Sequence, residues 1–295
     1  MSAFQDHLET GVTTLARCWI VIRRDGTRFG FTDHDRELSF DGMTFKADAG
    51  MTARAIVSAT GLSVDNSEAM GALSDVAITE ADIEAGRFDG AEVLAWIVNW
   101  ADVETRSLRF KGTIGELRRM GGAFHAELRG LTELLNQPQG RVYQTACSAI
   151  LGDAQCQFDL ETDGFATEIA VEALEEDRRF VFADFEAFEP AWFERGRLRV
   201  MSGAAEGLIA TIKRDRFKNG NREVEIWEAL RAPIKTGDVI RLEAGCDKRG
   251  ETCRLKFNNF LNFQGFPDVP GEDWLIAAPA SGGQNGGGSL RRVGV

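Results

Sequence analysis

The sequence predicts a mainly β (α+β) protein, built from linked β-barrels or sandwiches with a few short helices. Short runs of β-branched and aromatic residues alternate with turn signals, about every 8 to 12 residues, which is typical of such folds. The composition agrees, because 32 Gly and only 6 Pro suit a chain with many tight turns. At 295 residues, we expect two domains, or one domain with a large annex.

The N-terminal part of the chain reads as a β-meander. Residues 18–23 form a β-branched and aromatic run that stops at an Asp-Gly pair and resumes at residues 27–32. A second Asp-Gly pair separates residues 37–40 from residues 43–47. Asp-Gly between alternating apolar runs is a strong hairpin signal, so we expect two consecutive hairpins.

A short helix and three more strands follow. Thr79 supplies an oxygen cap, acidic residues fill the first turn, and Gly86 ends this helix. The expected strands are residues 92–100, 107–119 and 123–129, and residues 131–135 read as another short helix.

The second half of the chain is again rich in expected strands. These are residues 166–171, 179–182, 196–201, 207–212 and 222–227, with a hairpin turn at Asn219 and Gly220. The acidic residues 172–177 are interpreted as a solvated face. A helix over residues 251–263 would place Phe257, Phe260 and Phe263 on one side, and Gly265 and Pro267 would end it.

These patterns divide the chain into four parts. Residues 1–140 form an N-terminal β-rich domain, residues 141–165 a first cysteine segment, and residues 166–275 a second β-rich domain with a cysteine and Phe-rich segment. Residues 276–295 are a Gly-rich tail that we expect to be flexible.

Charge and hydropathy exclude several classes of function. Lys plus Arg is 34 and Asp plus Glu is 46, which gives a net charge of −12 and argues against a broad nucleic-acid-binding surface. No apolar run reaches the roughly 20 residues of a membrane span, and the N-terminus does not resemble a signal peptide. We therefore expect synthesis in a reducing cytoplasm, where the 5 cysteines are not disulfide-bonded.

Four cysteines in two pairs are the sharpest chemical feature. Eight residues separate Cys147 from Cys156, and six separate Cys246 from Cys253. Four thiolates could bind zinc or an iron–sulfur cluster, although zinc knuckles usually space each pair by about two to four residues. Ordinary buried cysteines are the alternative, and this is the interpretation favoured for Cys18, which sits in an apolar strand.

Other candidate groups have plainer interpretations. His7, His34 and His125 are far apart in sequence and lack a local nucleophile signature. The acids around His34, in residues 31–35, could bind a metal, but such turns usually satisfy their own backbone amides. The Phe-rich run from Phe257 could form a docking face, whereas aromatic residues at a spacing of three more often belong to a core.

Two segments resemble the signature segments of a tail hub family. They are residues 30–35 (GFTDHD) and 245–274, which begin GCDKRGETC and continue into the Phe-rich run. The family occurs in siphophages and in the gene transfer agents of alphaproteobacteria, and the resemblance covers roughly residues 1–275. The cysteine layout is also similar to that of the tail-tip protein L of phage lambda, whose ligand gaps hold a [4Fe–4S] cluster.

The resemblance implies a structural role in a virion tail baseplate assembled in the bacterial cytoplasm, without enzymatic activity. It implies a homotrimeric ring that contacts the distal tail protein, the tip protein and the tape measure protein, with DNA passing through the lumen without specific binding. Carried over, Cys147, Cys156, Cys246 and Cys253 become the ligands of a [4Fe–4S] cluster that pins the two cysteine segments together. From the net charge we also hypothesise that an acidic surface lines part of the channel.

Two alternatives stay open at this point. One is an enzyme, either a cell-wall hydrolase that uses His34 or His125 or an iron–sulfur oxidoreductase. The other is an adaptor with the same partners in which zinc replaces the cluster.

Overall fold

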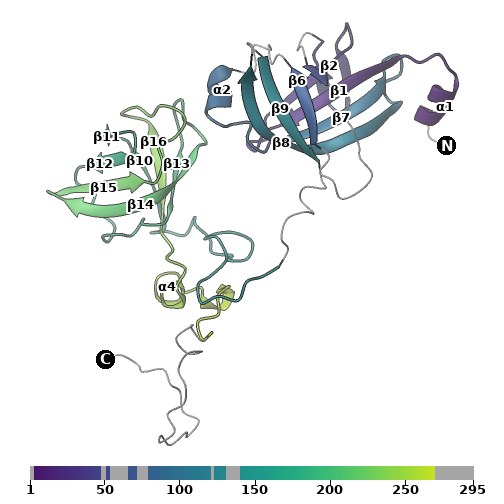
Figure 1. Ribbon diagram of the computed structural model, residues 1–295. Helices are drawn as coiled ribbons and strands as arrows, with labels where there is room; N and C mark the ends of the chain where they lie inside the picture. Colours follow the sequence, from purple (N-terminus) through teal and green to yellow (C-terminus); the bar gives the residue numbers. More distant parts are fainter. Residues whose placement is uncertain are drawn as a thin grey trace, which may run out of the picture.

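Two antiparallel seven-stranded sheets are the main regular structure of the described residues (Figure 1). This computed structural model describes residues 3–47, 51–53, 66–71, 79–120, 123–130 and 140–269. The helices in these ranges are short: α1 (Ala3–Glu9), α2 (Glu80–Glu84), α4 (Gly250–Leu255) and the 3-10 helix η1 (Phe260–Asn262). The predicted mainly β fold with a few short helices is confirmed. None of the described helices has the length and apolar character needed to cross a membrane.

The first sheet has the strand order β2-β1-β7-β8-β9-β6-β5. Its strands are β1 (Leu15–Ile22), β2 (Arg28–Thr32), β5 (Met51–Ala53), β6 (Asn66–Gly71), β7 (Glu92–Asn99), β8 (Arg106–Met120) and β9 (Ala123–Gly130). A separate hairpin of β3 (Leu38–Phe40) and β4 (Met43–Phe45) covers part of one face.

Strand β1 is buried on both faces, which explains its nearly continuous apolar sequence. Trp19 and Val21 enter one core cluster, whereas Cys18 and Ile20 enter a second cluster with Phe45 of the β3–β4 hairpin. The interpretation of Cys18 as a core residue is confirmed. Burial raises the pKa of its thiol to about 11, so it stays protonated at neutral pH.

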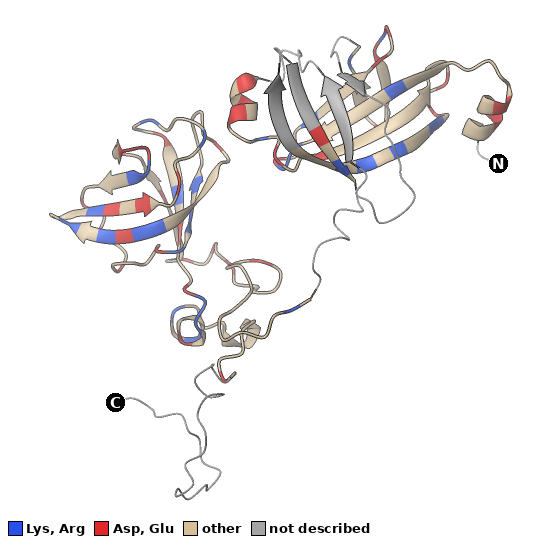
Figure 2. Ribbon diagram, viewed as in Figure 1, with Lys and Arg blue, Asp and Glu red and all other residues tan. Residues whose placement is uncertain are grey.

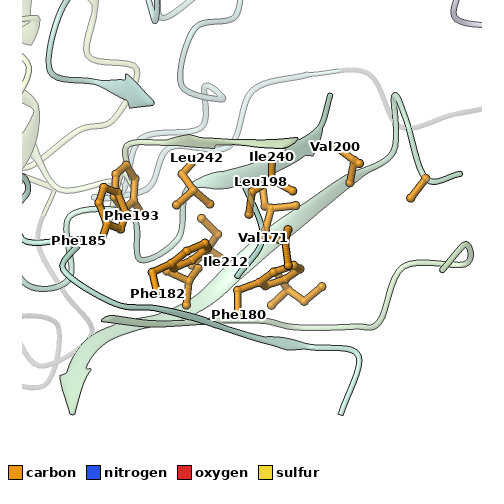
Figure 3. Packing of buried hydrophobic residues seen from close by; sticks show 13 residues of the cluster. Val171, Phe180, Phe182, Phe185, Phe193, Leu198, Val200, Ile212, Ile240 and Leu242 are labelled. Atoms are coloured by element: carbon orange, nitrogen blue, oxygen red, sulfur yellow. The ribbon is translucent and has the colours of Figure 1, made fainter. Parts of the chain in front are cut away.

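The second sheet closes into a barrel. Its order is β10-β16-β13-β14-β15-β12-β11, and its end strands β10 and β11 are joined by Val171 and Glu172 alone. The strands are β10 (Ala166–Ala170), β11 (Ala173–Glu175), β12 (Arg179–Phe182), β13 (Arg197–Val200), β14 (Ile209–Lys218), β15 (Asn221–Ile226) and β16 (Val239–Glu243). Alternate side chains from these strands point inward and fill the barrel, as Figure 3 shows for Phe180, Phe182 and Leu242.

The outer face of this barrel carries a ladder of cross-strand ion pairs. Lys213 on β14 lies 2.7 Å from Glu225 on β15, and Arg216 lies 2.8 Å from Glu223. Figure 2 shows the resulting mixture of basic and acidic residues along both strands. Hydrogen bonds from these basic groups hold the pKa of both glutamates below the usual value.

One ion pair is inside the barrel instead and fixes a long loop. Arg222 donates to both carboxylate oxygens of Asp215, at 2.8 and 2.6 Å, and both side chains are fully buried. The same guanidinium donates to the carbonyl oxygens of Phe188 and Glu189, at 2.8 and 2.9 Å. Asp215 in turn accepts the backbone N–H of Phe193 at 2.9 Å. The loop between β12 and β13 is thereby held against the barrel.

Local sequence signals predicted the turns and one helix cap correctly. Asn219 and Gly220 both have positive φ, 53° and 83°, as the two central residues of a tight hairpin require. Asp41 and Gly42 do the same, with φ of 51° and 68°. The side chain of Thr79 accepts the backbone N–H of Asp82 at the start of α2, at 3.1 Å.

Other predictions of local structure need correction. The predicted helix over residues 251–263 is wrong beyond Leu255, because Asn258 adopts φ of 47° and the chain turns back, so that Asn259 N–H donates to the Cys253 carbonyl at 3.0 Å. Strands β5, β6, β11 and β16 were not predicted. The expected helix at residues 131–135 and the tail at residues 276–295 lie outside the described residues, and the domain boundaries stay a prediction.

Candidate metal centre

The first cysteine segment is an irregular loop organised by one carboxylate. Asp153 accepts backbone N–H groups from Ile150, Gln155 and Cys156, at 2.8, 2.9 and 2.7 Å. These hydrogen bonds, the one from Cys156 first, lower the pKa of the Asp153 carboxyl. Local bonds to Asp153 therefore shape the part of the loop from Ile150 to Cys156, whereas Ala149 accepts a hydrogen bond from Lys248 of the second cysteine segment.

The second cysteine segment begins where β16 leaves the barrel. A Cβ atom on Gly245 would lie 1.7 Å from the carbonyl oxygen of Glu194, so only glycine fits this close backbone contact. Cys246 follows directly, and Cys253 lies in α4. The two cysteine segments meet where Cys147 N–H donates to the Lys248 carbonyl at 2.9 Å.

All four predicted cysteines line one cavity. Cys147, Cys156, Cys246 and Cys253 surround a small cavity of about 10 Å³ that is partly open to solvent. All four are free thiols. Lys248, Arg249, Phe257 and Asn259 are among the other residues that line the cavity. The fold thus brings together two cysteine pairs that are far apart in sequence.

Several polar groups are directed at the sulfur atoms. The backbone N–H of Gln264 donates to Cys147 Sγ at 3.4 Å, and the Asn259 side-chain amide lies 3.5 Å from Cys156 Sγ. The same amide donates to the Cys156 carbonyl at 2.7 Å. Donors of this kind stabilise sulfur that carries negative charge, as in metal thiolates and iron–sulfur clusters.

Burial and mutual proximity oppose ionisation of the thiols. Burial, and after it the charges of the other three cysteines of the cavity, raise the pKa of Cys253 to about 11. Burial also raises the pKa of Cys246. A bound cation would favour the thiolate forms instead. Among the described residues, no three Cys, His, Asp or Glu side chains form a group that could hold a metal ion. The four thiols line the cavity, but they do not converge on one position within it.

The Phe-rich run contributes to a core beside the cavity. Phe257 is buried and its ring lies 5.0 Å from that of Phe158 and 5.6 Å from that of Phe165. Phe165 continues the contact to Trp192, at 5.8 Å. For Phe257 the core interpretation is confirmed. The half-buried Phe260 and Phe263 stack on each other at 5.5 Å, and Phe263 lines the cavity.

The histidines have other surroundings. His34 Nδ1 accepts the backbone N–H of Arg36 at 3.0 Å, and its ring packs on Trp100 at 5.2 Å. His7 Nε2 accepts the backbone N–H of Thr14 at 3.2 Å. His125 lies in β9, and its side chain is outside those that the structure describes.

One acid near His34 satisfies a backbone amide, but on strand β1 and not in its own turn as expected. Asp33 accepts the backbone N–H of Arg17 at 2.6 Å.

Sequence reasoning missed three residues that shape this centre: Asp153, Lys256 and Asn259. For Asp153 a signal existed, because an aspartate that precedes a turn often accepts the backbone N–H groups that follow it. For Lys256 and Asn259 there was none, since their partners lie in distant segments.

The comparisons with known proteins decide the family. Residues 1–159 match the family model described as "Baseplate hub protein, N-terminal attachment domain". The chain belongs to this baseplate hub family. Residues 191–273 of the hub protein match a second family, described as "Phage conserved hypothetical protein BR0599". No curated protein matches the chain.

A solved structure is similar to the hub protein over nearly its whole length. It is a chain of the "Virion of native gene transfer agent (GTA) particle", with 54% identity and a TM-score of 0.89, over 99% of this chain and 100% of that chain. The resemblance drawn from residues 30–35 and 245–274 is thereby confirmed. Membership in the hub family makes the protein a component of the virion baseplate.

Proposed function

We propose that this protein is a structural hub in the tail baseplate of a gene transfer agent particle. The observation that carries the proposal is its similarity, over 99% of the chain, to a chain of a gene transfer agent virion. It forms a homotrimeric ring that joins the distal tail protein to the tip protein, and the tape measure protein and later DNA pass through the lumen. Closed symmetric rings of this kind are assembled from one repeated contact surface.

The four cysteines hold a [4Fe–4S] cluster in this proposal, with zinc as the alternative. Cys147, Cys156, Cys246 and Cys253 supply the thiolates, and the shared cavity with its N–H donors to sulfur supports this ligand set. When bound, the cluster supplies metal–thiolate bonds that cross-link the two segments. The chain's own residues position the thiols, and the role that we assign to the centre is structural and not catalytic.

The distribution of charge supports passage of DNA without specific binding. The net charge of −12 opposes retention of a polyanion. On the barrel, the basic side chains of β14 are paired with glutamates of β15, which reduces the net positive charge of that face.

Replacement of one cysteine tests the structural role. In a bacterium whose own copy is exchanged for Cys253→Ser, we expect a metal-depleted protein with a lower melting temperature and fewer complete particles. Cys18→Ala is the matched control, because Cys18 is buried beside the β3–β4 hairpin and lies outside the cavity. This variant is expected to keep its metal.

Cross-linking of purified tails then tests the ring. We expect hub trimers, and cross-links from the hub to the proteins above and below it. If Cys253→Ser assembles into particles with unchanged thermal stability, the cluster has no structural role. If the wild-type protein is missing from purified tails, the assignment as a hub is wrong.

A further inference from the structure

Lys256 lies where the cysteine helix meets the second barrel. It caps the C-terminal end of α4, and its side chain is half-buried. The ammonium donates to the carbonyl oxygens of Trp192 and Gly245, at 2.7 and 3.0 Å, and stands 4.1 Å from the centre of the Trp192 ring. One side chain therefore joins the helix of Cys253, the residue before Cys246 and the loop between β12 and β13.

The segments joined by Lys256 are themselves held firmly. Gly245 N–H donates to the Trp192 carbonyl at 2.8 Å, and the Trp192 indole donates to the Gly164 carbonyl at 3.1 Å. Trp192 lies in the loop that the buried Arg222 fixes against the barrel. The barrel core thus fixes the loop of Trp192, and the contacts of Lys256 with this loop fix the cysteine helix against the barrel.

The positive charge of Lys256 lies beside the segment of Cys246, because its ammonium donates to the carbonyl oxygen of the preceding residue, Gly245. Burial lowers the pKa of its ammonium, and ionisation of Cys246, as in a metal-bound thiolate, would be the strongest of the charges that oppose this shift. An iron–sulfur cluster or a zinc ion held by four thiolates carries a net negative charge. A half-buried cation beside it interacts more strongly than a solvated one, because the surroundings screen the charge less.

We propose that Lys256 is a positioning residue for the cysteine centre that also supplies its counter-charge. Its two hydrogen bonds fix the distance between the segment of Cys246 and the helix of Cys253, and its charge stabilises the anionic centre. This inference rests on the proposed function, because it requires that the four cysteines bind a metal or cluster.

Three variants of the full-length protein separate charge from packing. Lys256→Met keeps the aliphatic stem on Trp192 but removes the charge and both hydrogen bonds, whereas Lys256→Arg keeps the charge. Lys218→Met is the matched control, since Lys218 is an exposed lysine of β14 paired with Glu223. The readouts are the rate of metal release to a chelator, the midpoint potential of the cluster and the melting temperature.

We expect Lys256→Met to release metal about tenfold faster than wild type, the lower end of what loss of a residue supporting a metal ligand usually causes. Its cluster is expected to have a lower midpoint potential, because reduction adds negative charge that the lysine cation no longer stabilises. Lys256→Arg is expected to restore most of the potential, and Lys218→Met to behave as wild type.

Two results would overturn the inference while leaving the metal centre in place. One is a Lys256→Met protein with wild-type metal release and potential. The other is a lower melting temperature with both of those quantities unchanged, which would make Lys256 a purely structural residue. If the wild type holds zinc, the inference is tested by the rate of zinc release and by whether Lys256→Arg restores the wild-type rate. A wild-type protein without any metal would instead refute the proposed function itself.

Discussion

Replacement of Arg222 by Met should cost the second barrel much of its stability. The substitution leaves the fully buried Asp215 carboxylate without its cation, and it removes the side-chain donor to the Phe188 and Glu189 carbonyls. Loss of one partner from a buried ion pair typically costs about 3–5 kcal/mol, because the remaining charge stays buried and uncompensated. We expect a decrease of this size in the free energy of unfolding.

The assay is urea unfolding followed by tryptophan fluorescence, since Trp192 lies in the loop that Arg222 holds. Lys213→Met is the matched control, because it breaks the partly exposed pair with Glu225 and should cost less than about 1 kcal/mol. The double variant Asp215→Leu/Arg222→Met removes both charges and should recover much of the loss. An Arg222→Met protein within about 1 kcal/mol of wild type would refute the reasoning.

Three further substitutions probe the loops around the cysteines and the contact between the sheets. Asp153→Ala leaves three backbone N–H groups without their acceptor, two of them exposed to water, so we expect a loss of about 0.5–1.5 kcal/mol in thermal unfolding. Backbone hydrogen bonds lower the pKa of the Asp153 carboxyl below its ordinary value of 3.8. The stability that this carboxylate contributes is therefore present above pH 3.8 and is lost as the pH falls below that value. Titration of the melting temperature checks this. Gly245→Ala places a Cβ against the Glu194 carbonyl and should cost about 1–3 kcal/mol or more in urea unfolding. Arg231→Ala removes an exposed ion pair with Asp89, at 2.9 Å, and should change urea unfolding by less than about 1 kcal/mol.

Local signals were sufficient for the hairpins and the cap of α2. The Asp-Gly and Asn-Gly pairs specify tight turns by their backbone preferences alone, and Thr79 caps α2 through a contact three residues away. Strand β16 (Val239–Glu243) escaped prediction because its partners β10 and β13 are distant in sequence. Long-range pairing of this kind leaves little trace in a single sequence.

The cysteine site was likewise predictable only where local sequence carries the signal. Spacing alone left zinc, a cluster and ordinary buried cysteines open, and the resemblance to a known family selected the four ligands. The three-residue aromatic spacing suggested one long helix, but the left-handed backbone of Asn258 ends that possibility and buries Phe257 in a different core. Lys256 was beyond prediction, because its acceptors belong to a loop that the barrel positions.

Analysis of iron, zinc and acid-labile sulfide per chain, on protein purified without oxygen, is the most direct test of the cysteine centre. A [4Fe–4S] cluster on Cys147, Cys156, Cys246 and Cys253 requires about four irons and about four sulfides per chain. One zinc without sulfide would keep the cross-link and replace the cluster. Protein that holds neither metal would contradict the proposal that a metal centre on these four cysteines cross-links the two cysteine segments of the baseplate hub.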